Sequence, residues 1–95
     1  MNLATIREQI RPICVDMDIE MLGVFGSVAR GDDDAASDID LLVRFKKPVG
    51  LLDLIEIEER FAKALGRTVD LGTEASLHPL IKANVAEELK VLYEG

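Results

Sequence analysis

Residues 26–40 read Gly-Ser-Val-Ala-Arg-Gly-Asp-Asp-Asp-Ala-Ala-Ser-Asp-Ile-Asp, between two apolar runs at residues 21–25 and 39–45. The Gly-Ser turn after the first run can hold a phosphate, because a glycine lets the backbone approach an anion closely. Asp38 and Asp40 begin the second run and are one residue apart on an expected strand. Their carboxylates supply the oxygen ligands that divalent cations prefer. The stretch therefore predicts a site for a metal-bound nucleoside triphosphate.

Length and composition limit the alternatives. A chain of 95 residues has no room for a second core, so one domain, 1–95, is predicted. The net charge of −7 argues against direct nucleic-acid binding, which needs clustered lysine and arginine. Cys14 is the only cysteine, which predicts no disulfide framework and a reducing, cytoplasmic location. No apolar run is long enough to suggest a signal peptide or a membrane span.

Hydrophobic periodicity predicts the order helix, strand, strand, helix, strand, helix. These elements are expected at residues 3–17, 20–25, 38–45, 51–65, 68–71 and, from a start near Pro79, 81–92. Pro12 should kink the first helix or end it early, and Gly66 should stop the longest one. The predicted class is α/β (α+β), with a small mixed sheet of three or four strands. Its helices are expected to pack on one face of the sheet.

The strand at 38–45 alternates between a core face and an opposite face. The core face is expected to carry Ile39, Leu41, Val43 and Phe45. Asp38 and Asp40 share the opposite face, roughly 7 Å apart along the backbone. If the strand at 68–71 pairs beside this one, Asp70 joins them. Three crowded carboxylates repel one another unless cations neutralise them, which favours bound Mg²⁺.

This arrangement predicts phosphoryl chemistry. Two Mg²⁺ ions about 4 Å apart can clamp the attacking and leaving oxygens of an in-line displacement at phosphorus. Asp70 is expected either to bind metal with Asp38 and Asp40 or to take the acceptor's proton. Ser27 can donate its hydroxyl and backbone N–H to a phosphate, and Arg30 follows one helical turn later. The Arg30 guanidinium is placed to hold the departing pyrophosphate.

Each feature alone also has an ordinary structural explanation. A Gly-Ser dipeptide is commonly only a turn, and an Asp-x-Asp is commonly a solvated strand edge. Arg30 can pair with a neighbouring acidic residue, namely Asp32, Asp33 or Asp34. The joint occurrence of the features, in order and between periodic strands, favours the functional interpretation. His78 is interpreted as a surface residue and Tyr93 as a packing residue near the end of the last helix.

The motif also resembles a known family. Gly26-Ser27, a ten-residue gap and Asp38-Ile39-Asp40-Leu-Leu-Val resemble the signature of the polymerase-beta-type nucleotidyltransferases. The short chain and its Gly-Ser-Val-Ala-Arg-Gly turn resemble the minimal nucleotidyltransferases (MNT proteins). The resemblance implies the nucleotidyltransferase core, with triphosphate on Gly26 and Ser27 and Mg²⁺ on Asp38 and Asp40. Asp70, in Thr-Val-Asp-Leu, matches the third family carboxylate by position.

The same resemblance implies a function and a partner. Such proteins are commonly the antitoxin half of HEPN–MNT toxin–antitoxin pairs and transfer AMP from ATP to a tyrosine of the HEPN ribonuclease toxin. The sequence shows no second domain that would grip a base or bulky substrate, which favours a partner that completes the site. Two alternatives remain open: nucleotidyl transfer to a small molecule such as an aminoglycoside, and a non-catalytic antitoxin that acts by contact alone.

Overall fold

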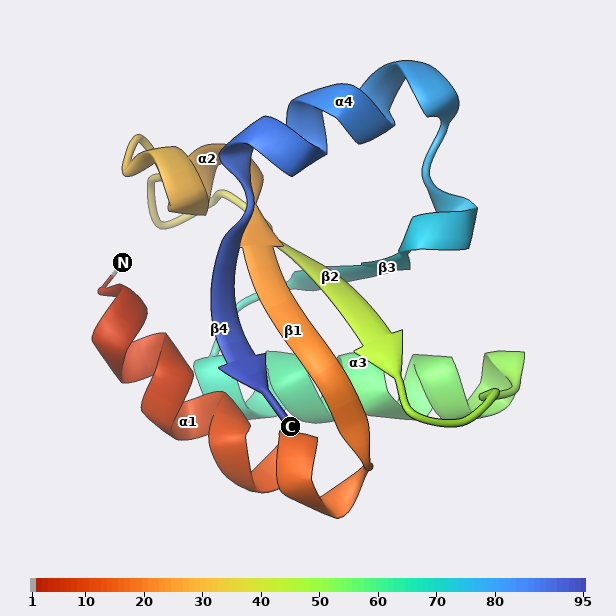
Figure 1. Ribbon diagram of the computed structural model, residues 1–95. Coiled ribbons are helices and arrows are strands. Elements are labelled where there is room, and N and C mark those ends of the chain that lie inside the picture. The colour runs from red at the N-terminus through yellow and green to blue at the C-terminus, as the bar shows by residue number, and fades with distance from the viewer. Residues whose placement is uncertain (1) are drawn as a thin grey trace.

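The chain forms a four-stranded mixed sheet with helices around it (Figure 1). A computed structural model describes residues 2–95. The elements are α1 (Leu3–Asp16), β1 (Ile19–Phe25), α2 (Gly26–Arg30), β2 (Ile39–Phe45), α3 (Leu51–Leu65), β3 (Val69–Thr73), η1 (Glu74–Ser76), α4 (Pro79–Glu88) and β4 (Lys90–Glu94). The spatial order is β3-β2-β1-β4. β1 is antiparallel to β2 and β4, and β2 is parallel to β3, so the predicted mixed α/β class is confirmed.

The main core lies between the sheet and the helices α1 and α3. The side chains that close it include Ile6, Ile10 and Cys14 of α1, Ile57 and Phe61 of α3, and Ile39, Leu41 and Val43 of β2. These β2 residues are three of the four that alternation assigned to the core face, and the fourth, Phe45, is half-buried and packs against this core. Fully burying a side chain such as Phe61 contributes about 2 kcal/mol, so this layer fixes the orientation of β2. The opposite face of β2 is thereby left for its aspartates.

The local sequence explains where the helices begin and end. The Asn2 side chain caps the first turn of α1, and Pro79 occupies the first turn of α4. Gly66 closes α3 in the left-handed conformation with φ at 67°, as its position predicted. Pro12 does not end α1 early, because it lies on the exposed side, where water can reach the carbonyl group that lacks its usual donor.

The predicted helix at 81–92 is wrong beyond Glu88. Residues 90–94 form β4, which pairs antiparallel with β1, and Tyr93 lies opposite Leu22 in this ladder rather than near a helix end. The apolar spacing suited a helix, but it also places Leu92 in the core of a strand. Pairing with β1 satisfies backbone groups that an open sheet edge would leave to solvent.

α4 also departs from the expected one-sided packing. Its Val85 is buried with Met21 of β1 and Leu42 of β2 in a second, small cluster on the aspartate side of the sheet. Leu42 is an apolar residue on that face, and the helix removes it from water. In Figure 1, α4 crosses the sheet end at which α2 follows β1. No helix within residues 2–95 is long and apolar enough to cross a membrane.

Candidate functional site

The Gly-Ser turn lies directly against an aspartate of the neighbouring strand. Gly26 follows β1 with φ at 72°, a left-handed conformation that side chains disfavour. A Cβ atom on Gly26 would collide with Oδ2 of Asp40. Both observations favour glycine here. The close approach brings the turn expected to bind phosphate next to a carboxylate expected to bind metal.

Strand pairing brings the predicted carboxylates together. Asp40 of β2 and Asp70 of β3 are register partners on parallel strands, so their side chains leave the same face. Asp38 precedes β2, two residues from Asp40, and therefore lies on that face as well. Asp38 and Asp70 are exposed and Asp40 is half-buried. The structure thus places these three carboxylates on one face of the sheet, at the end of β2 that lies near α2.

The electrostatics of this cluster are unfavourable without a cation. Partial burial raises the pKa of Asp40, and the negative charges of Asp70 and Asp38 raise it further, while Arg30 opposes the shift. Among residues 2–95, no three acidic, histidine or cysteine side chains are already gathered into a metal cage. Mg²⁺ does not require one, since it is commonly held by one or two carboxylates, waters and substrate phosphates. The donor set therefore fits Mg²⁺ that arrives with a nucleotide.

Arg30 and the turn face an acidic residue that the sequence did not single out. Nη1 of Arg30 donates to Oε1 of Glu88 at 3.0 Å, and Nε donates to Oδ2 of Asp32 at 3.2 Å. The backbone N–H of Gly26 donates to the other Glu88 oxygen at 3.3 Å. Two groups predicted to bind phosphate thus already contact a carboxylate. Ser27, on the same short helix, is half-buried beside them.

Two further residues missed in the sequence support the strands of the site. Glu58, on α3 beside its apolar stripe, accepts the backbone N–H of Leu71 at 3.0 Å, next to Asp70. Arg67 contacts the loop that precedes Asp38. No short motif marks any of these positions. The one available signal was that Glu58 interrupts the apolar stripe of α3, which indicates a polar partner inside the fold.

Comparison with known proteins decides the family. Residues 7–92 match the family model described as "Nucleotidyltransferase domain". This chain belongs to the nucleotidyltransferase domain family. The match confirms the enzyme class and the family resemblance that the residues at 26–40 indicated.

Two relatives of this chain are named as protein adenylyltransferases, one of them as "Putative protein adenylyltransferase MJ0435". MJ0435 of Methanocaldococcus jannaschii is 38% identical over 88 residues, which cover 93% of this chain and 95% of the relative. The protein adenylyltransferase MntA of Thermococcus cleftensis is 41% identical over 71 residues, which cover 75% of this chain and 72% of the relative. A chain in a crystal structure of a toxin–antitoxin complex with AMP-PNP superposes with a TM-score of 0.77 at 25% identity, covering 100% of this chain and 75% of its own length.

Proposed function

We propose that this nucleotidyltransferase is an antitoxin that transfers AMP from ATP to a tyrosine hydroxyl of a HEPN-type toxin and thereby silences it. The observation that carries the proposal is the contact between Gly26 and Asp40, because it joins a phosphate-binding turn to a metal-binding carboxylate. The names of the relatives support a protein as acceptor, and the structural neighbour belongs to a toxin–antitoxin complex with an ATP analogue. An acceptor protein also suits a site that lies open at one end of a small sheet.

In this proposal, the turn residues Gly26 and Ser27 bind the triphosphate and Arg30 neutralises charge on the departing pyrophosphate. Asp38, Asp40 and Asp70 would hold Mg²⁺. When bound, this ion neutralises phosphate charge and polarises the oxygens around phosphorus. The chain's own contribution is mainly to position the reacting groups in a fixed constellation.

The transfer itself is a displacement at the α-phosphorus. The tyrosine oxygen forms a bond to this phosphorus, and the bond from the phosphorus to the bridging oxygen breaks, so that pyrophosphate leaves. The hydroxyl proton passes to a carboxylate or to water. Asp70 takes this proton in the alternative in which it does not bind metal, because its strand lies at the edge of the sheet, where a partner's side chain can approach.

The surface of α4 supports a protein partner. Leu80 and Ile81 are 79% and 50% exposed on the helix that also carries Glu88. Exposed apolar side chains on a helix that also contributes to a polar site are compatible with a protein-binding surface. A toxin bound on α4 would bring its own acceptor residue close to the aspartates.

The test is the intact mass of the protein that co-purifies with this chain, before and after addition of ATP and Mg²⁺. We expect a gain of one or more adenylyl units, located on tyrosine by peptide mapping, and no gain with the Asp38→Asn/Asp40→Asn variant. If neither protein modifies the partner while both still form the complex and neutralise it, contact alone accounts for the antitoxin action. If the wild-type protein releases pyrophosphate only with small hydroxylated acceptors, the small-molecule alternative is correct.

A further inference from the structure

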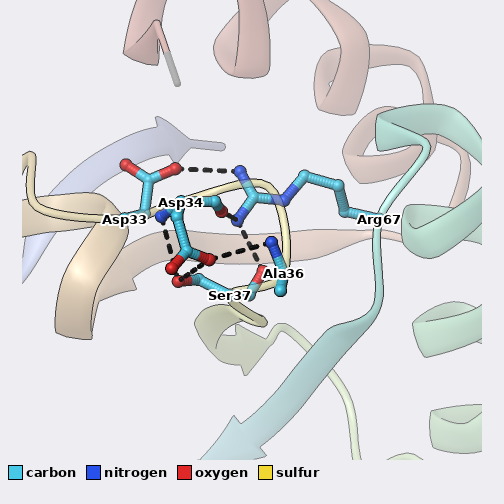
Figure 2. Close-up of polar contacts among 5 residues, drawn as sticks. All are labelled: Asp33, Asp34, Ala36, Ser37 and Arg67. Carbon is cyan, nitrogen blue, oxygen red and sulfur yellow. Dashed lines mark hydrogen bonds and ion pairs between the residues drawn. The ribbon is translucent and has the colours of Figure 1, made fainter.

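Arg67 joins the loop at residues 31–38 to the start of β3. It follows Gly66, which closes α3, and its guanidinium reaches back across the loop, as Figure 2 shows. Nη1 donates to Oδ2 of Asp33 at 2.9 Å, and Nη2 donates to the backbone carbonyl groups of Asp34 and Ser37. The Arg67 and Asp33 side chains are only 15% and 5% exposed. One side chain therefore holds the loop at three points, in partial shelter from water.

The loop that Arg67 holds also has internal hydrogen bonds. The Asp34 side chain accepts the backbone N–H of Ala36 at 2.9 Å and the hydroxyl of Ser37 at 3.2 Å. The Ser37 hydroxyl oxygen accepts the backbone N–H of Asp34 at 3.1 Å. These bonds shape the loop into a compact turn (Figure 2). Because these bonds join Asp34, Ala36 and Ser37 to one another, the contacts of Arg67 with Asp34 and Ser37 restrain the last residues of the loop.

Those last residues lead directly into the proposed metal site. Asp38 lies between Ser37, whose carbonyl group accepts from Arg67, and Ile39, whose N–H donates to the Thr68 carbonyl group at 2.9 Å. The backbone on both sides of Asp38 is thus held by two consecutive residues, 67 and 68. The same segment continues into β3 and reaches Asp70 three residues after Arg67. It therefore sets the position of Asp38 relative to Asp70.

We propose that Arg67 is a positioning residue for nucleotidyl transfer: it fixes the loop 31–38 so that Asp38 stays on the face shared with Asp40 and Asp70. This inference rests on the proposed function, which assigns metal binding to these aspartates. The planar guanidinium suits the task, because its fork of donors serves a carboxylate and backbone carbonyl groups together. A lysine at this position would keep the charge but lose the fork.

The variants are Arg67→Met, which removes all three contacts, and Arg67→Lys, which keeps the charge. Arg60→Met is the matched control: Nη1 of Arg60 donates to Oδ2 of Asp16 at 2.8 Å and joins α3 to α1 away from the loop. The first measurement is hydrogen exchange in the metal-free protein, read at the loop amides of Asp34, Ala36 and Ser37. We expect exchange there to accelerate at least tenfold in Arg67→Met, less in Arg67→Lys, and not in Arg60→Met.

The second measurement is Mn²⁺ binding in the presence of AMP-PNP. We expect the affinity for Mn²⁺ to fall about tenfold in Arg67→Met. The affinity of Arg60→Met should stay close to that of wild type, even if the two substitutions lower the free energy of unfolding by similar amounts. Loop exchange and Mn²⁺ affinity that are unchanged in Arg67→Met would overturn the positioning role while leaving the proposed function in place. If wild-type protein binds Mn²⁺ no better than Asp38→Asn/Asp40→Asn, the metal site itself is wrong, and both proposals fail together. Should Arg67→Met not fold, Arg67→Lys and Asp33→Asn provide the same comparison.

Discussion

The Glu88 carboxylate accepts a hydrogen bond from the backbone N–H of Gly26 at 3.3 Å, although the two residues are 62 positions apart. Its other oxygen accepts from Nη1 of Arg30 at 3.0 Å. Since Gly26 and Arg30 are the groups proposed to bind triphosphate, Glu88 places a negative charge where an anion is expected. Nucleotide binding on these groups therefore has to displace the carboxylate or work against its charge.

We predict that Glu88→Gln increases the affinity for AMP-PNP with Mn²⁺ about three- to tenfold, because it removes a like charge at a solvent-screened distance. Isothermal titration calorimetry measures the change directly. Glu87→Gln is the control, since it removes the same charge from the next, exposed position of α4. A loss of affinity specific to Glu88→Gln would instead show that Glu88 orients Arg30 for the nucleotide.

Gly26→Ala is predicted to destabilise the fold more than Gly31→Ala. Both glycines have positive φ, 72° and 80°, so both variants incur the left-handed penalty of about 1–2 kcal/mol. Only at Gly26 does the new Cβ meet another group, the carboxylate of Asp40, whereas nothing lies within 4 Å of a Cβ at Gly31. Urea unfolding of the two variants gives the difference. Equal losses would mean that Asp40 moves aside without cost.

Asp40→Asn is predicted to abolish transfer and to stabilise the metal-free protein slightly. The pKa of Asp40 is raised in the folded state, so the folded protein binds its proton more tightly than the unfolded chain does. The charged carboxylate therefore destabilises the fold at neutral pH, and this penalty disappears as the pH falls below the unfolded-state pKa of about 4. We expect less than about 1 kcal/mol at pH 7, because solvent screens a half-buried group.

The measurement for this prediction is the free energy of unfolding of wild type and Asp40→Asn between pH 7 and pH 4, without divalent metal. The stability of Asp40→Asn minus that of wild type should be positive at pH 7 and fall toward zero as the pH falls. A difference that is negative at pH 7 and rises toward acid pH would mean that a favourable partner of the Asp40 carboxylate outweighs burial and the like charges. Adding Mg²⁺ and nucleotide should reverse the order at pH 7, since only the wild-type carboxylate gains from the cation.

Glu58→Met is predicted to cost about 1–2 kcal/mol of stability, because the backbone N–H of Leu71 loses its acceptor in a partly buried place. Glu58→Gln keeps an acceptor oxygen and should lie close to wild type. Glu59→Met tests for a general effect of the substitution, since Glu59 is exposed on the same helix. Chemical denaturation gives the free energy of unfolding of each of the three variants. If Glu58→Met and Glu59→Met have equal stability, the bond to β3 contributes nothing.

Local patterns in the sequence predicted the parts that local geometry governs. Alternation assigned Ile39, Leu41 and Val43 to the core because successive side chains of a strand leave opposite faces, and these three residues are buried. Gly66 predicted the end of α3 because a left-handed residue favours glycine. The Gly-Ser turn and the Asp-x-Asp pair predicted the family because each of these motifs consists of residues that are close together in the chain.

Other features depended on partners distant in the chain. Residues 90–94 fit a helical spacing, yet they form a strand because β1 offers an unpaired edge. α4 packs on the face of the sheet that carries Asp40, because its Val85 buries the apolar side chains of Leu42 and Met21 there. The sequence contained these apolar residues, but their periodicity did not say which surface they would meet.

By itself, then, the sequence determined the turn at Gly26, the strand that carries Asp40 and directly follows Asp38, and the family to which the chain belongs. Only the tertiary structure decided that Asp70 lies opposite Asp40, that Glu88 contacts Gly26 and that Arg67 holds the loop before Asp38. The physical reason is the range of the forces that select each feature. Backbone geometry and side-chain spacing act within a few residues, whereas strand pairing and burial are settled only when the whole chain has collapsed onto one core.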